Sequence, residues 1–410
     1  MIGFEQALAA VLGSISRIGS ERVKIISGLH RILAEDINAI RDVPAFANSA
    51  MDGYALRSAD LKNASWKSPV VLEVIGDLDA GCVSAKRLKK GQAMRIMTGA
   101  PIPQGADSVV MVEFTRKFKP AAGEFVKVFR ATGRKENIRA RAEDLKNGEK
   151  VLVKGSLIRP QEMGILVSMG VSSISVARKP RVGILTTGDE LVEIDKPLAR
   201  GKIRDSNAYC LAGQVISAGA TPLRLGIARD NLKQVRRKIS AAINKNLDLL
   251  LVSGGVSVGD YDLVKDVLLE LSAKIKVWRV AIRPGKPLVF GYIKGIPVFG
   301  LPGNPVSGMV VFEEFVRPAI LKMCGARKLF RPITTAMLRQ PFEKRKGLKY
   351  FVRVRIENKN NRFYASLTGP QGSAILKSMV LADAIMVVPE EKSELKKGDR
   401  VCVQLLTDSF

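Results

Sequence analysis

Histidine is almost absent from this chain, and cysteine is scarce. His30 is the one histidine among 410 residues, so a histidine-based catalytic triad would have to be built on it, and no G-x-S-x-G segment supplies a nucleophile. The four cysteines, Cys82, Cys210, Cys324 and Cys402, stand far apart, with no C-x-x-C pair. This spacing argues against zinc knuckles and a disulfide framework, and it suits a reducing cytosol.

Long apolar runs are missing as well. No stretch approaches the length of a membrane span, and the amino terminus lacks the apolar core of a signal peptide, so we expect a cytoplasmic protein without membrane contacts. Neither the G-x-x-x-x-G-K-[ST] nor the G-x-G-x-x-G fingerprint occurs, which disfavours P-loop NTPases and Rossmann dehydrogenases. With 410 residues, the chain exceeds what one hydrophobic core usually serves, so we expect several domains.

Acidic residues are the minority among the charged side chains. Lys and Arg number 66 against 39 Asp and Glu, which gives a formal charge of +27. A surplus of this size raises the alternative of a nonenzymatic basic protein, either a nucleic-acid binder or a scaffold. The cations are scattered, however, and aromatics make up 6% of the chain, so we expect no nucleic-acid partner. A diffuse surface charge and a field that collects anions stay equally open.

The stretch from Leu249 to Leu271 organises the α/β part of the chain. Leu249 to Val252 is a short apolar run, typical of a strand buried on both faces of a parallel sheet. Ser253, Gly254 and Gly255 follow, and helical spacing of apolar residues begins after Asp262. A glycine-rich turn between a strand and a helix favours anions, and Asp260 and Asp262 add carboxylates. The turn could therefore hold a phosphate, a divalent cation or both.

Strand and helix patterns alternate from Arg181 onward, which predicts a βαβ series and a mostly parallel sheet. Thr221 to Ala228 and Trp278 to Ile282 are among the strands that we expect. Because parallel strands end at one edge, the polar residues that follow them should gather there. These are the acids Asp189, Glu190, Asp230, Asp260 and Asp262 and the cations Arg279, Arg283 and Lys286. Carboxylates that suit Mg²⁺ next to anion-binding groups imply a metal–phosphate ligand.

The regions outside this series have different patterns. Apolar residues from Phe4 to Ile15 predict an amino-terminal helix, and a second short helix is expected at Leu29 to Leu33. Residues 46–144 contain short β-like runs and read as a small β domain inserted into a discontinuous one. Beyond Arg327 the pattern is all β, which predicts a small barrel or sandwich.

Eight short motifs in one order carry a family resemblance. They are NSAMDGYA at 48–55, MTGAP at 97–101, NIRARAED at 137–144, TGDEL at 187–191, DSN at 205–207, SGGVSVG at 253–259, RPGKP at 283–287 and LPGNPVS at 301–307. Together they resemble the molybdopterin molybdenumtransferase family, MoeA, to which the E domain of gephyrin is similar. Each motif alone is weak, but eight in sequence are highly specific, and they span essentially the whole chain.

The resemblance implies a multidomain fold of the α/β plus β class. It predicts a discontinuous helical domain at 1–45 and 145–177, a β insert at 46–144, a three-layer α/β molybdopterin-binding domain at 178–326, similar to the adenylyltransferase MogA, and a β-barrel at 327–410. Family members are homodimers. Their active cleft is thought to lie between the α/β domain of one subunit and the insert of the other.

The resemblance also implies an activity. Members use adenylylated molybdopterin and molybdate, release AMP in a reaction that needs a divalent cation such as Mg²⁺, and leave molybdenum on the dithiolene. Contact with the adenylyltransferase that acts one step earlier is expected. That preceding step, adenylyl transfer from ATP to molybdopterin, is the alternative enzymatic function, although the insert and barrel disfavour it. Molybdate and tungstate have the same shape and charge, so the sequence leaves the choice of oxyanion open.

Candidate site residues follow from the resemblance position by position. Glu190 and Asp262 are expected to hold the cation, and Arg279 and Arg283 stand where the best-known members carry Lys, so their charge is transferred without detailed geometry. Arg353 is a weaker match. The full set expected to act in catalysis is Asp52, Thr98, Arg139, Asp144, Glu190, Asp230, Asp262, Arg279 and Arg283. The set expected to bind substrate is Ser253, Gly254, Gly255, Lys286, Pro302, Pro305 and Ser307.

Overall fold

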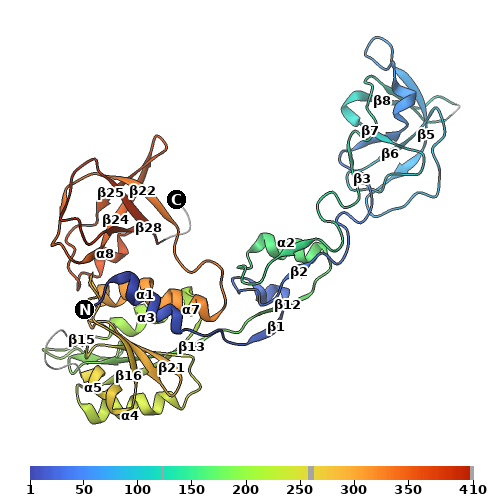
Figure 1. Cartoon of the computed structure of the whole chain (residues 1–410). Coiled ribbons are helices and arrows are strands. Elements are labelled where there is room, and N and C mark those ends of the chain that lie inside the picture. Colours follow the sequence, from blue (N-terminus) through green and yellow to red (C-terminus); the bar gives the residue numbers. More distant parts are fainter. Residues whose placement is uncertain (122, 257–262, 407–410) are drawn as a thin grey trace.

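The molecule is elongated, with a large double unit at one end and a small β unit at the other (Figure 1). Its computed structural model describes residues 1–121, 123–256 and 263–406. The α/β domain and the carboxyl-terminal barrel lie side by side, a thin linking unit follows, and the β insert stands at the opposite end (Figure 1). The multidomain α/β plus β architecture is therefore confirmed, while the predicted domain limits stay predictions.

A six-stranded sheet forms the centre of the α/β domain. Its strand order is β16-β13-β17-β21-β20-β18, and every neighbouring pair is parallel except the two that involve β20. The strands are β13 (Arg181–Thr187), β16 (Thr221–Ala228), β17 (Leu249–Ser253), β18 (Lys274–Trp278), β20 (Val289–Ile293) and β21 (Ile296–Leu301). The prediction of a mostly parallel sheet is confirmed.

The strand predicted from Trp278 to Ile282 was wrong. β18 ends at Trp278, and Arg279 has a left-handed backbone with φ of 60°, so the chain leaves the sheet there. Ile282 and Arg283 instead form β19 (Ile282–Arg283), which pairs with the barrel. The antiparallel β20 was missed.

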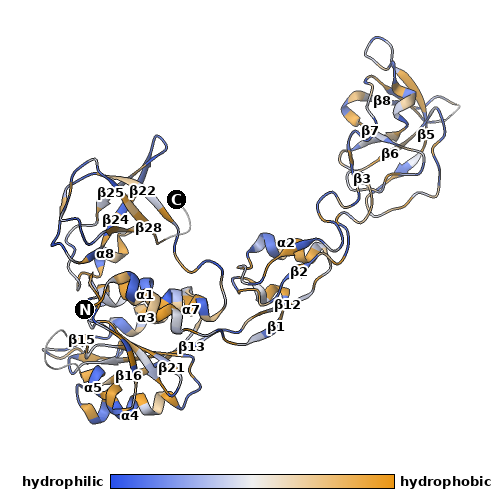
Figure 2. Ribbon diagram, in the orientation of Figure 1, coloured by the Kyte–Doolittle hydropathy of each residue, from blue (hydrophilic) through white to orange (hydrophobic). Residues whose placement is uncertain are grey.

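Helices cover both faces of this sheet. One core cluster joins α1 (Phe4–Ser14), α3 (Ser206–Ser217), α6 (Pro305–Val311) and α7 (Arg317–Met323) to the strands, and another joins α4 (Leu232–Ile243) and α5 (Leu263–Glu270). Every residue of β17 is buried, which explains its uninterrupted apolar run. Hydrophobic residues are concentrated in the central strands, whereas the helices are mixed (Figure 2). Asp205 caps α3 by accepting a hydrogen bond from the Ala208 N–H.

The linking unit contains less helix than the sequence predicted. The amino-terminal helix exists as α1, but Ala7, Val11 and Ile15 pack into the α/β core. The second short helix was wrong, because the chain makes a 3-10 turn at Ile25–Gly28 and then forms isolated β-bridges. Among the described residues, the linking unit consists of β1 (Ser20–Lys24) paired with β12 (Ser173–Ala177), β2 (Ile37–Asn38) paired with β11 (Lys150–Leu152), and α2 (Pro160–Ser168).

The two remaining units are the β structures that were predicted. The insert has a six-stranded sheet of order β7-β4-β6-β5-β9-β8, formed by β4 (Gly53–Leu56), β5 (Val70–Leu78), β6 (Gln92–Ile96), β7 (Ser108–Met111), β8 (Thr115–Phe118) and β9 (Phe125–Val128). The carboxyl-terminal strands close into a ring of order β24-β25-β22-β28-β26, because β26 also pairs with β24. They are β22 (Ile333–Leu338), β24 (Lys349–Lys359), β25 (Arg362–Leu367), β26 (Ala384–Val388) and β28 (Arg400–Leu405). This closed ring confirms the barrel.

The helices are all short. Within the described ranges, none combines the length and the hydrophobicity needed to cross a membrane.

Candidate functional site

One edge of the α/β sheet gathers the predicted polar loops. Since β20 is antiparallel to both of its neighbours, β18 runs in the same direction as β13, β16, β17 and β21. The carboxyl ends of these five strands therefore lie at the same edge, where open α/β sheets bind ligands. Glu190, Asp230, Arg279 and Pro302 each follow such an end, and Ser253 is the last residue of β17.

Carboxylates crowd together at one side of this edge. The Asp230 N–H donates a 3.3 Å hydrogen bond to Asp189 Oδ1. Burial raises the pKa of the Asp230 carboxyl, and the negative charges of Glu190 and Asp189 raise it further, although an N–H from Asp189 opposes them. Asp189 was not chosen as a site residue, although its place beside Glu190 after a strand was the signal that could have found it.

The residue types of this carboxylate group suit a divalent cation, although the described side chains are not arranged as a ligand set. Carboxylate oxygens are the ligands that Mg²⁺ prefers, and a cation would relieve the repulsion among Asp189, Glu190 and Asp230. Over the described ranges, no cluster of three or more possible His, Cys, Asp or Glu ligands assembles. Asp260 and Asp262 lie outside the described residues, so the metal role of Asp262 stays a prediction, as does that of Glu190.

The glycine-rich turn after β17 packs tightly against the end of β13. Gly254 and Gly255 have φ of 93° and 64°, and a Cβ at Gly254 would overlap the carbonyl oxygen of Thr187. A Cβ at Gly255 would lie 2.8 Å from Thr187 Oγ1. Both positions thus require glycine, because the turn is left-handed and has no room for a side chain.

Asn207 connects the turns that follow β17 and β21. Its Nδ2 donates to Ser253 Oγ at 2.9 Å and to the Gly303 carbonyl at 2.7 Å. The Ser253 hydroxyl in turn donates to the Pro302 carbonyl at 3.4 Å. Asn207 belongs to the DSN motif at 205–207 but was not among the candidate site residues, so its bridging role was missed.

The Pro302 to Pro305 turn also contacts the barrel. Asn304 Nδ2 donates to Ser373 Oγ at 3.0 Å, and the Val306 N–H donates to the Ser373 carbonyl at 3.1 Å. Pro305 is the first residue of α6, and Ser307 is buried within that helix. Ser373 had no sequence signal, because its proximity depends on how the barrel docks.

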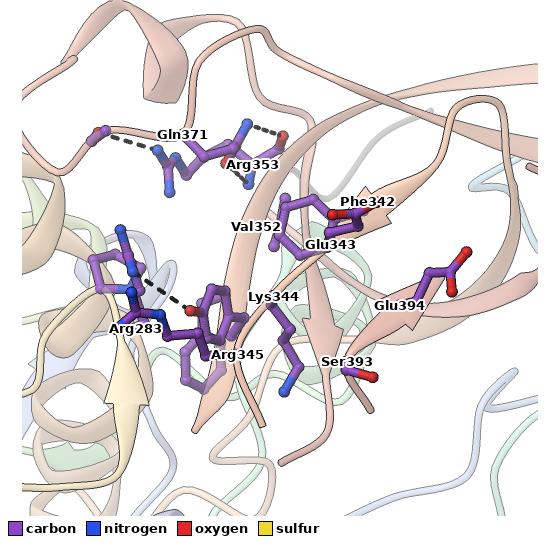
Figure 3. A pocket seen from close by; sticks show the side chains of 14 residues that line it. Arg283, Phe342, Glu343, Lys344, Arg345, Val352, Arg353, Gln371, Ser393 and Glu394 are labelled. Carbon is purple, nitrogen blue, oxygen red and sulfur yellow. Dashed lines mark hydrogen bonds between the residues drawn. The ribbon is translucent and has the colours of Figure 1, made fainter. Parts of the chain in front are cut away.

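Basic side chains lie at the other side of the edge, where the α/β domain meets the barrel. Arg279, Arg283 and Lys286 lie on the loop between β18 and β20. Arg283 Nη1 donates a 3.5 Å hydrogen bond to the Tyr350 hydroxyl, which belongs to β24 of the barrel (Figure 3). The loop is therefore fastened to a second domain.

A cavity of about 820 Å³ opens beside this loop. Arg283, Lys344, Arg345 and Arg353 line it, and Figure 3 shows the Arg353 side chain above that of Arg283. Carboxylates of Glu343 and Glu394 lie on a further wall, so the cavity has a basic and an acidic side.

Arg353 is the unusual residue of this cavity. It is 1% exposed, and its guanidinium donates 3.2 Å hydrogen bonds to Ser378 Oγ and to the Gly372 carbonyl. Burial lowers its pKa to about 10, and among the described residues no carboxylate pairs with it. A buried cation without an acid partner favours an anionic ligand.

Two of the four candidate residues of the insert, Asp52 and Thr98, bond to each other. Asp52 Oδ1 accepts hydrogen bonds from the Thr98 N–H at 2.7 Å and from Thr98 Oγ1 at 2.8 Å, and these bonds lower the pKa of Asp52. β10 (Ile138–Arg139) pairs with β3 (Asn48–Ser49), which places Arg139 opposite Asn48. Asp144 lies at the base of the insert, where its N–H donates to the Val43 carbonyl.

Within one chain, the two groups of candidate residues stand at opposite ends of the molecule (Figure 1). In the insert, Asp52 is exposed and bonded to Thr98. Neither residue reaches the α/β sheet edge of its own chain (Figure 1). The fold thus defines a multidomain protein whose α/β domain presents both carboxylates and basic side chains at one sheet edge.

Comparison with known proteins identifies this class more closely. Residues 2–170 match the MoeA N-terminal region (domain I and II), residues 183–322 match a probable molybdopterin binding domain, and residues 335–406 match the MoeA C-terminal region (domain IV). The chain is 38% identical to the molybdopterin molybdenumtransferase of Bacillus subtilis over 95% of this chain and 90% of that protein. It is 33% identical to the Staphylococcus aureus enzyme over 100% of this chain and 96% of that protein.

Solved structures agree with these matches. A molybdopterin biosynthesis MoeA protein from Pyrococcus horikoshii superposes with a TM-score of 0.85 at 31% identity, covering 99% of this chain and 100% of that one. This chain belongs to the MoeA family of molybdopterin molybdenumtransferases.

Proposed function

We propose that this protein inserts molybdate into adenylylated molybdopterin, releases AMP and thereby forms the molybdenum cofactor. The observation that carries the proposal is the division of one sheet edge into an acidic side and a basic side. Carboxylates of Asp189, Glu190 and Asp230 stand at one side, and the cation-bearing loop and its cavity stand at the other. The substrates require both, since they combine a phosphate link, which a metal ion can neutralise, with a separate oxyanion.

The glycine turn suits the molybdopterin end of the substrate. Gly254 and Gly255 bring bare backbone close to the edge, and Asn207 fixes this turn against the Pro302 turn. The buried hydroxyl of Ser253 shares that network. Ligand atoms would approach this turn from the side that Thr187 does not occupy.

The basic side suits the anionic groups that react. Arg279, Arg283 and Lys286 would stabilise negative charge that develops on phosphate oxygens as AMP leaves. Arg353 and Arg283 flank a cavity that can take an oxyanion, and the absence of a described carboxylate partner for Arg353 leaves its charge for that ligand. We assign molybdate to this cavity.

Glu190 and Asp262 would hold a divalent cation, with Asp230 close to Glu190. When bound, such a cation supplies charge neutralisation at the phosphate and lowers the pKa of bound water.

We further propose that the active unit is a homodimer. Asp52, Thr98, Arg139 and Asp144 would complete the cleft of a second copy, because the elongated chain holds them away from its own sheet edge (Figure 1). The Thr98 bonds keep Asp52 ionised and fixed in direction. An ionised carboxylate in the cleft can orient water or a substrate hydroxyl.

Incubation of the purified protein with adenylylated molybdopterin, Mg²⁺ and molybdate tests the activity. We expect molybdate-stimulated release of AMP together with cofactor that restores activity to an apo-molybdoenzyme. Glu190→Gln should keep the fold and lose turnover. Consumption of ATP with molybdopterin, and no molybdate-dependent AMP, would instead support adenylyl transfer and contradict the proposal.

Mixing two inactive variants tests the shared cleft. A dimer of one Asp52→Asn chain and one Glu190→Gln chain has one cleft with both changes and one with neither. After subunit exchange of an equal mixture, about a quarter of the wild-type rate should return, since about half of the dimers are mixed and each has one intact cleft. A mixture that stays as inactive as its components would contradict a cleft built from two chains.

A further inference from the structure

The extreme amino terminus contacts the loop that carries the candidate cations. The Ile2 N–H donates a 3.2 Å hydrogen bond to the Arg279 carbonyl, and the Ala281 N–H donates a 2.8 Å bond to the Ile2 carbonyl. Ile2 thereby forms a parallel bridge with Val280. These main-chain bonds join positions 2 and 279–281, which are far apart in the sequence.

Arg279 needs outside support for its conformation. Its φ of 60° is left-handed, a region that a long side chain rarely adopts and that persists where the surroundings fix it. The Arg279 N–H donates to the Leu288 carbonyl at 2.9 Å, which fixes one end of the residue. The Ile2 N–H fixes the other end, because it binds the Arg279 carbonyl.

Ile2 is itself held firmly. α1 begins two residues later, and the Phe4 ring packs against Phe315 and Phe351 with ring centroids 5.3 and 5.4 Å away. Glu5 forms an ion pair with Lys349 of the barrel. The amino-terminal segment is thus anchored to both large domains and cannot drift from the loop independently.

The barrel holds the loop from its other side. The Lys349 N–H donates to the Ala281 carbonyl at 2.9 Å, and β19 pairs in parallel with the first residues of β24. The segment between Arg279 and Arg283 therefore lies between the amino-terminal segment around Ile2 and the barrel. Both neighbours come from outside the α/β sheet.

We propose that Ile2 is a positioning residue for the reaction, whose main chain holds Arg279 in the orientation that meets the anionic substrate. The inference rests on the role given to Arg279 under the proposed function. In this proposal the Ile2 N–H binds the Arg279 carbonyl and so fixes the direction of the arginine side chain.

Ile2→Pro removes the N–H that binds the Arg279 carbonyl. Gly3→Pro is the matched control, because Gly3 has φ of −65°, the value proline imposes, and open space where a Cβ would stand. Ile2→Ala keeps the N–H and measures the loss of side-chain packing. We expect Ile2→Pro to lower kcat/KM for adenylylated molybdopterin at least tenfold. Gly3→Pro should keep kcat/KM within twofold of wild type. The melting temperatures of Ile2→Pro and Ile2→Ala should be alike.

A double-mutant cycle with Arg279→Ala separates positioning from general stability. If Ile2 acts through Arg279, Ile2→Pro should change kcat/KM less than twofold once Arg279→Ala is present. A full tenfold loss in that background, or an equal loss in Gly3→Pro, would overturn the inference and leave the proposed function standing. Wild-type kcat/KM in Arg279→Ala would refute the role of Arg279 and the inference together, while AMP release in the same assay would still report on the activity. Should Ile2→Pro not fold, Ala281→Pro removes the reciprocal donor and enters the same cycle.

Discussion

A buried acid at the junction of the α/β domain and the barrel makes the stability of this protein depend on pH. Glu314 lies in the π-helical turn Phe312–Val316 between α6 and α7. Its pKa is raised from 4.5 to about 8, first by burial and then by the charge of Glu313, while Gln404, Lys349 and Arg317 oppose the rise. Its Oε1 has no hydrogen-bond partner among the described residues. Replacement by the isosteric Glu314→Gln removes the titration and little else.

The sign and size of the effect follow from the two pKa values. Below pH 4.5 the carboxyl is protonated in both the folded and unfolded chain, so it imposes no pH-dependent cost. Between pH 4.5 and 8 the unfolded chain releases the proton and the folded chain keeps it, so the free energy of unfolding falls as pH rises. The full loss is about 5 kcal/mol, reached above pH 8. Glu314→Gln should therefore gain stability relative to wild type from pH 5 to pH 8.

Urea unfolding at pH 5, 6, 7 and 8 measures this difference. The chain has two tryptophans, and a Trp66→Phe background leaves Trp278, at the end of β18, as the reporter of the α/β domain. Glu313→Gln is a contrasting variant, because Glu313 forms ion pairs with Arg331 at 2.6 Å and with Arg317 at 3.4 Å, and because its charge is one cause of the raised Glu314 pKa. It should destabilise the domain at neutral pH, since it leaves two partly buried arginines without this acid. Parallel curves for wild type and Glu314→Gln across this range would refute the reasoning.

Two further substitutions test the site itself. Gly254→Ala should lower the free energy of unfolding by about 2 kcal/mol or more and abolish turnover, because φ is 93° and the Cβ would meet the Thr187 carbonyl. Gly213→Ala is the control: it lies inside α3 with open space around it and should be neutral or stabilising by up to about 1 kcal/mol. Equal melting temperatures for the two variants would contradict the prediction for Gly254. Arg353→Met should leave the melting temperature within a few degrees of wild type, because it removes a buried charge that has no carboxylate partner among the described residues. It should raise the molybdate concentration for half-maximal rate at least tenfold. An unchanged molybdate dependence would remove Arg353 from oxyanion binding.

The central sheet was predictable because its strands are buried on both faces. Leu249 to Val252 is an unbroken apolar run, and the glycines after it could only be a turn. β20 and β19 were not predictable in the same way. Their placement depends on the chain reversal at Arg279, and a left-handed arginine leaves no mark in the hydrophobic pattern.

The candidate site residues also differ in how far the sequence could identify them. Motif resemblance selected Asp52 and Thr98, which the fold joins by two hydrogen bonds across 46 positions of sequence. Arg353 stood out less, because a charged residue in a strand is usually expected on the solvent face, yet this one is buried within β24. Ser373 and Tyr350 reach the edge only because the barrel docks there, and docking is a property of tertiary packing that local sequence does not encode.

The barrel therefore has more than a supporting role in the proposed reaction. It supplies Arg353 to one wall of the cavity, anchors Arg283 through Tyr350, and touches the Pro302 turn through Ser373. The loop that carries Arg279 and Arg283 lies between this barrel and the amino-terminal segment around Ile2. The α/β domain, the barrel and the amino-terminal segment therefore determine its position together. An α/β domain cut free of the other units would keep its strands and acids, but it would lose the elements that direct Arg279 and Arg283 toward an anion. This dependence explains why an α/β sheet edge with acids and glycines needs the remaining domains before it can support the proposed insertion of molybdate.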